Sequence, residues 1–210
     1  MSFKKIMLLA SMAMAAVAFA APAAQATAPE WYHGGVKVGG QANAKTLHVT
    51  GSLSSEVVGT GFESGPCEVT FSGLAWNENN MADGEITGGS FHTHTCETNV
   101  EGCTITPTLQ NFPWNITGVT ITPGATPPAK AGSGIEIQGA QFENHYIGGT
   151  CPVPVSTIMA TGTATAYVDT NSNKCLDFEN HIDGMQTHAP LPTLTVDIRG
   201  TVCDTTLELQ

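Results

Sequence analysis

The sequence predicts an all-β protein, a single-domain antiparallel β-sandwich of roughly nine or ten strands that is stabilised by disulfides. Three observations predict this fold. Short runs that alternate apolar and polar residues recur, Gly, Pro and Asn separate them, and no long stretch has helical periodicity. So many strands in one chain need two packed sheets or a sheet closed on itself, and we favour the sandwich.

Two runs show the alternation most clearly. Their apolar faces consist of Leu47, Val49 and Leu53 in the first run and Cys67, Val69 and Phe71 in the second. Because side chains alternate between the two faces of a strand, each set is expected to point into the core. The residues between them, mostly Thr, Ser and Glu, are expected to face outward.

Three features interrupt the alternation. Residues 77–84 (NENNMADG) predict a connecting loop, because Asn, Asp and Gly favour turns. Pro107 cannot donate a ladder hydrogen bond, which predicts an edge position for its strand. The apolar phase shifts at Gly139, so a β-bulge is expected there.

The first 26 residues have the order of a secretory signal peptide. Lys4 and Lys5 precede an apolar run, and small residues end it at Ala26. The apolar run is shorter than the ~20 residues that a membrane span needs, and no later segment is apolar enough to form a span in the mature chain. We therefore expect residues 27–210 to form one β-sandwich domain that is secreted or held at the cell surface.

Charge excludes one class of partner. Without Lys4 and Lys5, the mature chain has five basic and 18 acidic residues, a formal charge of −13 with neutral histidines. Such an acidic protein repels the phosphate backbone, so no nucleic-acid partner is expected.

All six cysteines lie in the predicted mature chain, and an even number in an exported protein indicates three disulfides. Cys175 and Cys203 both fall on polar strand faces, so they are expected to meet across strands. Cys96 and Cys103 enclose a short segment and are expected to form a disulfide that closes a hairpin. This leaves Cys67 with Cys151, although six cysteines allow many other pairings.

Several short motifs are spread over most of the mature chain: WYHGG at 31–35, LHVTG at 47–51, FPW at 112–114, GTCP at 149–152, and Cys67, Cys96 and Cys103. In these motifs the chain resembles a group of uncharacterised secreted, β-rich, cysteine-containing proteins of soil actinobacteria. It departs from that group at Phe112, where Leu is usual, and in having Cys175 and Cys203. The resemblance implies an exported β fold and no particular activity.

A calcium site is one alternative at the turn after residue 168. Asp169, Asn171 and Asn173 alternate as the first ligands of a calcium loop do, and Asp177 could complete the shell. Lys174 stands where such a loop needs Gly. A hairpin turn closed by side-chain to backbone hydrogen bonds accounts for the same residues. No cofactor is assigned, and calcium is kept as an option.

A transition-metal site is a second alternative. His92, His94 and Cys96 have a period of two, so on a strand their side chains would project from one face and could bind zinc or copper. Against this site, Cys96 is expected to be used in a disulfide.

Trp31, Tyr32 and Trp76 could form a platform on which a sugar ring stacks, provided that they are exposed. Packing in the core or at a sheet edge is the competing interpretation. No catalytic residue is assigned, because the chain has no Gly-x-Ser-x-Gly elbow, His-Glu-x-x-His helix or phosphate-binding Gly loop.

Together these features predict a secreted or cell-surface structural or binding protein without catalytic activity, whose extracellular or surface ligand is unknown. The alternative is a calcium-assisted carbohydrate-binding module. A secreted hydrolase is a third hypothesis, ranked below the other two.

Overall fold

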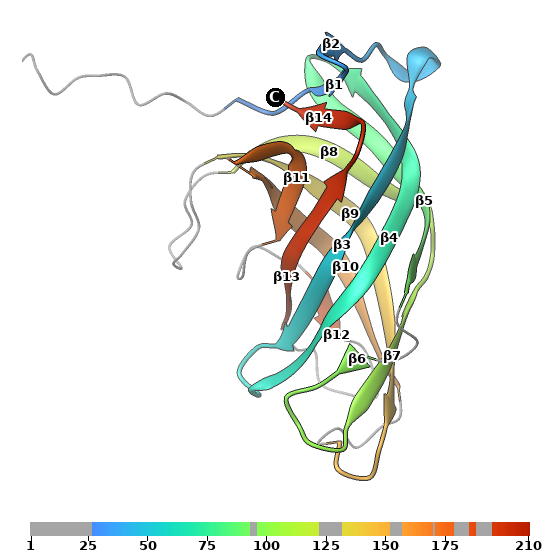
Figure 1. The fold of residues 1–210 in the computed structure, drawn as a ribbon, viewed down its shortest axis with the longest axis vertical. Helices are drawn as coiled ribbons and strands as arrows, with labels where there is room; N and C mark the ends of the chain where they lie inside the picture. The colour runs from blue at the N-terminus through green and yellow to red at the C-terminus, as the bar shows by residue number, and fades with distance from the viewer. Residues whose placement is uncertain are drawn as a thin grey trace, which may run out of the picture.

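The computed structural model describes residues 27–92, 96–121, 132–151, 157–169, 171–178, 185–187 and 195–210, with the backbone alone for 185–187. The predicted signal peptide lies outside these residues. Strands and one short 3₁₀ turn, η1 (Gln41–Asn43), make up the regular structure of the described part (Figure 1), which confirms the all-β antiparallel fold. In the same residues, no helix has the length and apolar character needed to cross a membrane.

The strands, in chain order, are β1 (Trp31–His33), β2 (Val36–Lys37), β3 (Lys45–Val57), β4 (Phe62–Glu78), β5 (Met81–Phe91), β6 (Cys96–Glu97), β7 (Thr104–Leu109), β8 (Trp114–Ile121), β9 (Gly132–Ile147), β10 (Thr157–Asp169), β11 (Ser172–Phe178), β12 (Met185–Thr187), β13 (Thr195–Asp204) and β14 (Leu207–Leu209).

Eleven strands form one large sheet, in the order β11-β10-β12-β13-β3-β4-β5-β8-β9-β7-β6. The other three form a small sheet, β14-β1-β2. We call the end that carries β1, β2 and η1 the upper end, and the end that carries β6 and β7 the lower end, as in Figure 1.

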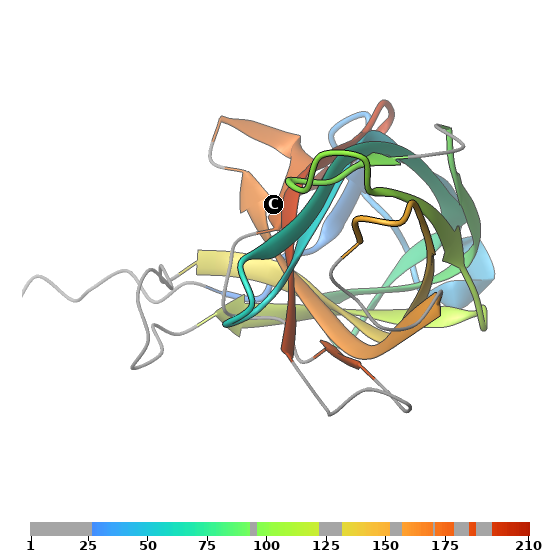
Figure 2. The same cartoon turned by 90° about the horizontal axis from the view of Figure 1, so that it is seen from below.

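The large sheet closes on itself through two further pairings, β9 with β10 and β11 with β13. In the upper half the ring therefore runs β13-β3-β4-β5-β8-β9-β10-β11 and back to β13. Opposite sides of the sheet face each other across the core, as the layers of a sandwich do, and Figure 2 shows the strands curving around a common centre.

The lower half of the ring uses different strands. The long strand β9 pairs with β8 over residues 132–138 and with β7 over residues 142–147. β12 lies between β10 and β13, and β6 pairs with β7. Ser64 of β4 bridges to Thr98 just after β6, so β6 takes the place beside β4 that β5 has in the upper half.

The core confirms the predicted strand faces. Both apolar sets, Leu47, Val49 and Leu53 in β3 and Cys67, Val69 and Phe71 in β4, are buried. The main cluster fills the upper and middle parts of the ring, where side chains of β3, β4, β5, β8, β9, β11 and β13 meet. A second buried cluster lies at the lower end and contains Cys67, Cys96 and Cys103.

One predicted loop is wrong. Residues 77–84 do not form a long connection, because β4 continues to Glu78 and β5 begins at Met81. The turn consists of Asn79 and Asn80, whose φ angles of 52° and 59° are left-handed. Two consecutive left-handed residues give a tight turn whose twist matches that of the flanking strands, and Asn tolerates this conformation well.

The other two interruptions are confirmed. Gly139 has a φ of 76° and no partner on β10, because Ala140 pairs with Gly162 and Gln138 with Thr163. Pro107 pairs with β9 on one side only. Among the described strands, none pairs with it on the other side.

The structure contains three disulfides, as predicted, but only one of the three predicted pairings is correct. Cys175 and Cys203 are directly opposite in the β11–β13 register and are bonded. The pairings of Cys96 with Cys103 and of Cys67 with Cys151 are wrong. The structure has Cys67–Cys96, which joins β4 to β6, and Cys103–Cys151, which joins the start of β7 to the segment after β9.

Hydrogen bonds explain why no disulfide closes the segment between Cys96 and Cys103. Cys96 is paired with Ile105, so Cys103 lies beyond the β6–β7 ladder. The Thr98 hydroxyl contacts the carbonyls of Val100 (3.1 Å) and Cys103 (2.8 Å), and the Cys103 amide donates to Val100 (3.0 Å). These bonds close the turn, which leaves both thiols to reach other strands.

Peptide mapping under non-reducing conditions tests this connectivity. A protease that cuts after acidic residues can cleave at Glu97 or Glu101, which separates Cys96 from Cys103, and at Asp169, which separates Cys151 from Cys175. We expect disulfide-linked peptides that join Cys67 to Cys96 and Cys103 to Cys151. A linked pair of Cys67 and Cys151 peptides would contradict the lower-end architecture.

Candidate functional site

The four residues of the calcium hypothesis take part in three separate sets of hydrogen bonds. The Asp169 Oδ1 accepts hydrogen bonds from the Asn171 amide (2.8 Å) and side chain (3.2 Å), which is a side-chain-closed turn. Asp177 is paired with Tyr167, two residues before Asp169 on β10, and the register shifts between Val168 and Asp169. Its carboxylate accepts a hydrogen bond from Thr201 (2.6 Å).

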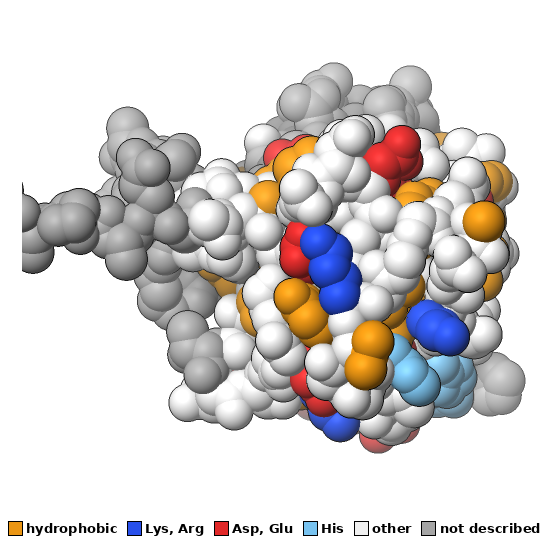
Figure 3. All heavy atoms as spheres, turned by 90° about the horizontal axis from the view of Figure 1, so that it is seen from above, with side chains coloured by type: hydrophobic (Ala, Val, Ile, Leu, Met, Phe, Trp, Pro, Cys, Tyr) orange, Lys and Arg blue, Asp and Glu red, His pale blue; other side chains and the backbone are white. Residues whose placement is uncertain are grey.

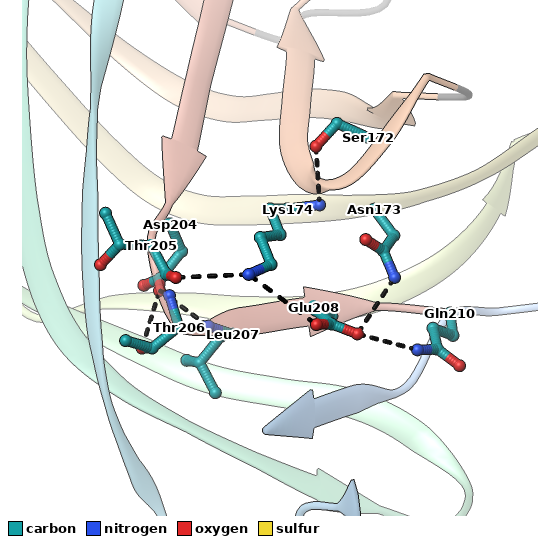
Figure 4. A network of polar contacts seen from close by, with 9 residues as sticks. All are labelled: Ser172, Asn173, Lys174, Asp204, Thr205, Thr206, Leu207, Glu208 and Gln210. Atoms are coloured by element: carbon teal, nitrogen blue, oxygen red, sulfur yellow. Dashed lines mark hydrogen bonds and ion pairs between the residues drawn. The ribbon is translucent and has the colours of Figure 1, made fainter. Parts of the chain in front are cut away.

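Asn173 belongs to a network between β11 and the C-terminal strand (Figure 4). Its side chain donates to Glu208 (3.2 Å), and Lys174 donates to the carbonyl of Thr205 (3.4 Å). Buried Asp204 accepts hydrogen bonds from the amides of Thr206 (2.6 Å) and Leu207 (2.8 Å). These side chains hold β14 in place. Among the described residues, no group of three or more His, Cys, Asp or Glu could hold a metal.

The histidine hypothesis loses one of its ligands. Cys96 is bonded to Cys67, so its sulfur is not a thiolate that could bind a metal. His92 shares a hydrogen bond with the Thr70 hydroxyl on the neighbouring strand. His94 lies outside the described residues.

The two tryptophans do not form an exposed platform. Trp31 is 2% and Trp76 7% exposed, so their rings are packed against protein. Trp31 also donates its indole N–H to the carbonyl of Asp83 (3.0 Å). Tyr32 is half-buried and its hydroxyl donates to Glu30 (3.4 Å).

A hollow inside the lower half of the ring is the better candidate site. About 40 Å³ of it is open to the centre of a water molecule. Its walls therefore lie close together. Strands β3, β4, β5, β7, β9, β10 and β13 all contribute to the lining, which is mainly apolar; examples are Leu53, Phe91, Ile105, Phe142 and Val196.

A few polar groups interrupt this apolar lining. The hydroxyls of Ser55 and Ser64 are hydrogen-bonded to each other (2.7 Å). Asn144 and Tyr146 lie near them, lining an adjoining smaller gap. None of the residues that line the two hollows is charged. An apolar pocket with a few convergent polar groups is the usual form of a small-molecule site.

β5 and β7 both contribute residues to the wall of the hollow. The upper part of β5 pairs with β8 at residues 83–86, but within the described chain residues 88–91 pair with β4 alone. Leu109 of β7 packs against Gly89, where a Cβ would lie 2.8 Å from the leucine side chain. Phe91 and Pro107 line the hollow below this contact. In the described chain, side-chain packing rather than a hydrogen-bond ladder joins the lower part of β5 to β7.

Burial raises the pKa of the Tyr146 phenol. Desolvation raises its pKa to about 12, and a hydrogen bond with Asn144 offsets part of this shift. The ring of Phe62 lies 5.6 Å away, centroid to centroid, in a tilted arrangement. The phenol beside the hollow therefore stays neutral to a higher pH than that of an exposed tyrosine.

Sequence reasoning did not find this site, although a signal was present. Ser55 stands between Leu53 and Val57 in the inward phase of its strand, and Asn144 stands between Phe142 and Tyr146. A polar residue in an inward position needs a hydrogen-bond partner or water, and it therefore marks a polar spot in an apolar interior.

No family model, curated protein or solved structure matches this chain. The resemblance to exported actinobacterial proteins stays a prediction, and the arguments about function below rest on the geometry of the chain itself.

The raised pKa of Tyr146 predicts a loss of stability at high pH. Unfolded tyrosine ionises with a pKa of 10.0, whereas folded Tyr146 ionises near 12. Between these values the unfolded state binds fewer protons, so the free energy of unfolding falls by about 2 to 3 kcal/mol as pH rises through this window. Urea unfolding at a series of pH values measures this loss.

The Tyr146→Phe variant serves as the comparison. It should show a smaller fall in the free energy of unfolding between pH 10 and 12 than the wild type does. Equal slopes for wild type and Tyr146→Phe would show that the phenol is not buried.

Proposed function

We propose that this protein is an exported binding protein without catalytic activity, which holds a small neutral and mainly apolar ligand in the lower hollow. The observation that carries the proposal is the hollow itself, which has a mainly apolar lining with a few polar residues and no charged one.

The lining defines the chemistry of the ligand. A charged group would lose its hydration in this hollow and gain no opposite charge, which costs several kcal/mol. A hydroxyl, carbonyl or amide group can instead exchange hydrogen bonds with Ser55, Ser64 or Asn144. The narrow walls suit an alkyl chain or a flat ring better than a bulky body.

The polar groups do not form a catalytic constellation. A serine nucleophile needs a base that removes its proton, and no His, Asp or Glu lines either hollow. Ser55 and Ser64 bond to each other instead. This arrangement supports binding rather than hydrolysis.

Two features support export of this binding protein from the cell. Three disulfides are compatible with an oxidising compartment, and the N-terminal sequence predicts a signal peptide. A ligand carrier outside the cell also benefits from the high negative charge, which keeps acidic proteins soluble.

Three probes with one alkyl chain and different head groups test the proposal: 1-octanol, octanoate and octylammonium. Burial of the chain, less the cost of immobilising it, predicts a Kd for 1-octanol of the order of 10 to 100 µM. The two charged probes should bind at least about tenfold more weakly. Isothermal titration calorimetry of the oxidised protein measures all three.

Two variants on one strand locate the binding. Ala160 is buried and lines the hollow, so Ala160→Leu should fill it and abolish 1-octanol binding. Thr161, the next residue, points to the other face, and Thr161→Leu should bind as wild type does. Equal binding by the wild type and Ala160→Leu, or tighter binding of octanoate than of 1-octanol, would overturn the proposal.

A further inference from the structure

A second hollow lies at the upper end, outside the ring. It is lined by His33, Val36, Lys37, Val38, Gly39, Asn43 and Lys45, which come from the β1–β2 hairpin, η1 and the start of β3. About 360 Å³ of it is open to the centre of a water molecule, far more than in the lower hollow. Figure 3 views this end and shows lysine and histidine side chains on its surface.

The lining is cationic although the protein is strongly acidic. It includes two lysines and one histidine and no Asp or Glu. Lys37 is neutralised by Glu30, whose carboxylate lies 2.6 Å from its Nζ. Lys45 therefore carries the positive charge in this lining that can attract a small anion.

Lys45 differs from every other described lysine or arginine. Lys37, Lys174 and Arg199 all have carboxylate partners. In the described residues, Lys45 has neither an ion pair nor a side-chain hydrogen bond, so its ammonium group is available for a ligand.

The floor of the groove is held rigidly by a buried amide. The Asn77 side chain accepts a hydrogen bond from the Trp31 amide (2.7 Å) and donates to the carbonyls of Trp31 (2.9 Å) and Val38 (2.8 Å). The backbone N–H of Asn77 donates to the carbonyl of Gly39 (2.9 Å). These bonds fix the backbone between Lys37 and the 3₁₀ turn, so the groove is formed before a ligand binds.

Because Gly39 has no side chain, the side chain of Asn43, a further hydrogen-bond donor, fits beside it. A Cβ at this position would lie 3.1 Å from the Asn43 Cβ and 3.2 Å from its Nδ2, so glycine lets the amide side chain lie against the backbone. Asn43 thus lines the same hollow as Lys45 and His33. An amide, an imidazole and an ammonium group can all donate hydrogen bonds to one anion.

We propose that the upper groove binds a small organic carboxylate. Lys45 supplies the unpaired positive charge, and His33 and Asn43 supply hydrogen-bond donors. Val36, which is 70% exposed at this groove, offers an apolar contact for the body of the ligand. This site is separate from the lower hollow, which takes a neutral ligand.

Benzoate and its neutral analogue benzamide test the proposal, with binding followed by NMR shifts of His33 and Asn43. Benzoate should produce saturable shifts at these residues, and the Lys45→Met variant should bind it about fivefold more weakly, as expected for a partly exposed ion pair. Lys174→Met, which removes a lysine already paired with Glu208, should bind as wild type does. Added salt should weaken binding.

One variant is expected to bind benzoate more tightly than the wild type does. Glu30→Gln removes the carboxylate partner of Lys37 and should tighten benzoate binding about threefold. Lys45→Arg keeps the charge and should retain binding, while thermal melting confirms that each variant folds. Ala160→Leu should leave benzoate binding unchanged, which separates this test from that of the lower hollow. Benzamide binding as tightly as benzoate, or no loss in Lys45→Met, would overturn the proposal.

Discussion

The Cys67–Cys96 disulfide joins β4 to β6 where the backbone ladder of the upper ring ends. β5 ends at Phe91, which pairs with Val69 of β4. Cys67 lies two residues from Val69 towards the lower end, and its disulfide links β4 to β6 there. Closing a loop of this length restricts the unfolded chain by about 3 to 4 kcal/mol in the chain-entropy model. The Ser64–Thr98 bridge and the hydrogen bonds of Asn99 with Gly61 and Glu63 join the same two parts of the chain, and the disulfide adds a covalent link to them.

The two halves of the ring consequently differ in what they contain. The upper half closes through continuous strand pairing and the Cys175–Cys203 disulfide, and its interior is filled by large apolar side chains such as Ile116 and Ile137. In the lower half, small residues such as Ala160 and Ser64 face the interior, and a hollow results. A rigid frame around an underfilled interior is an arrangement that suits binding, because the frame does not collapse when the site is empty.

Local patterns predicted much of the fold. Strand parity alone identified the inward faces of β3 and β4, the bulge at Gly139 and the Cys175–Cys203 pair, because each depends on the two-residue period of a strand. The other two disulfides and the lower hollow depend on which distant strands become neighbours, and parity carries no such information. Asn79 and Asn80 were assigned to a long loop because turn-forming residues indicate that a turn exists but do not give its length.

The central claim is that the disulfide-bound lower end encloses a site for a neutral ligand. Intermolecular nuclear Overhauser effects between bound 1-octanol and protein methyl groups test this claim most directly. The structure predicts contacts to the methyl groups of Ile105, Ile198 and Val196, which line the hollow. Contacts confined to exposed methyl groups such as those of Val36 or Leu74 would place the ligand on the surface and contradict the claim.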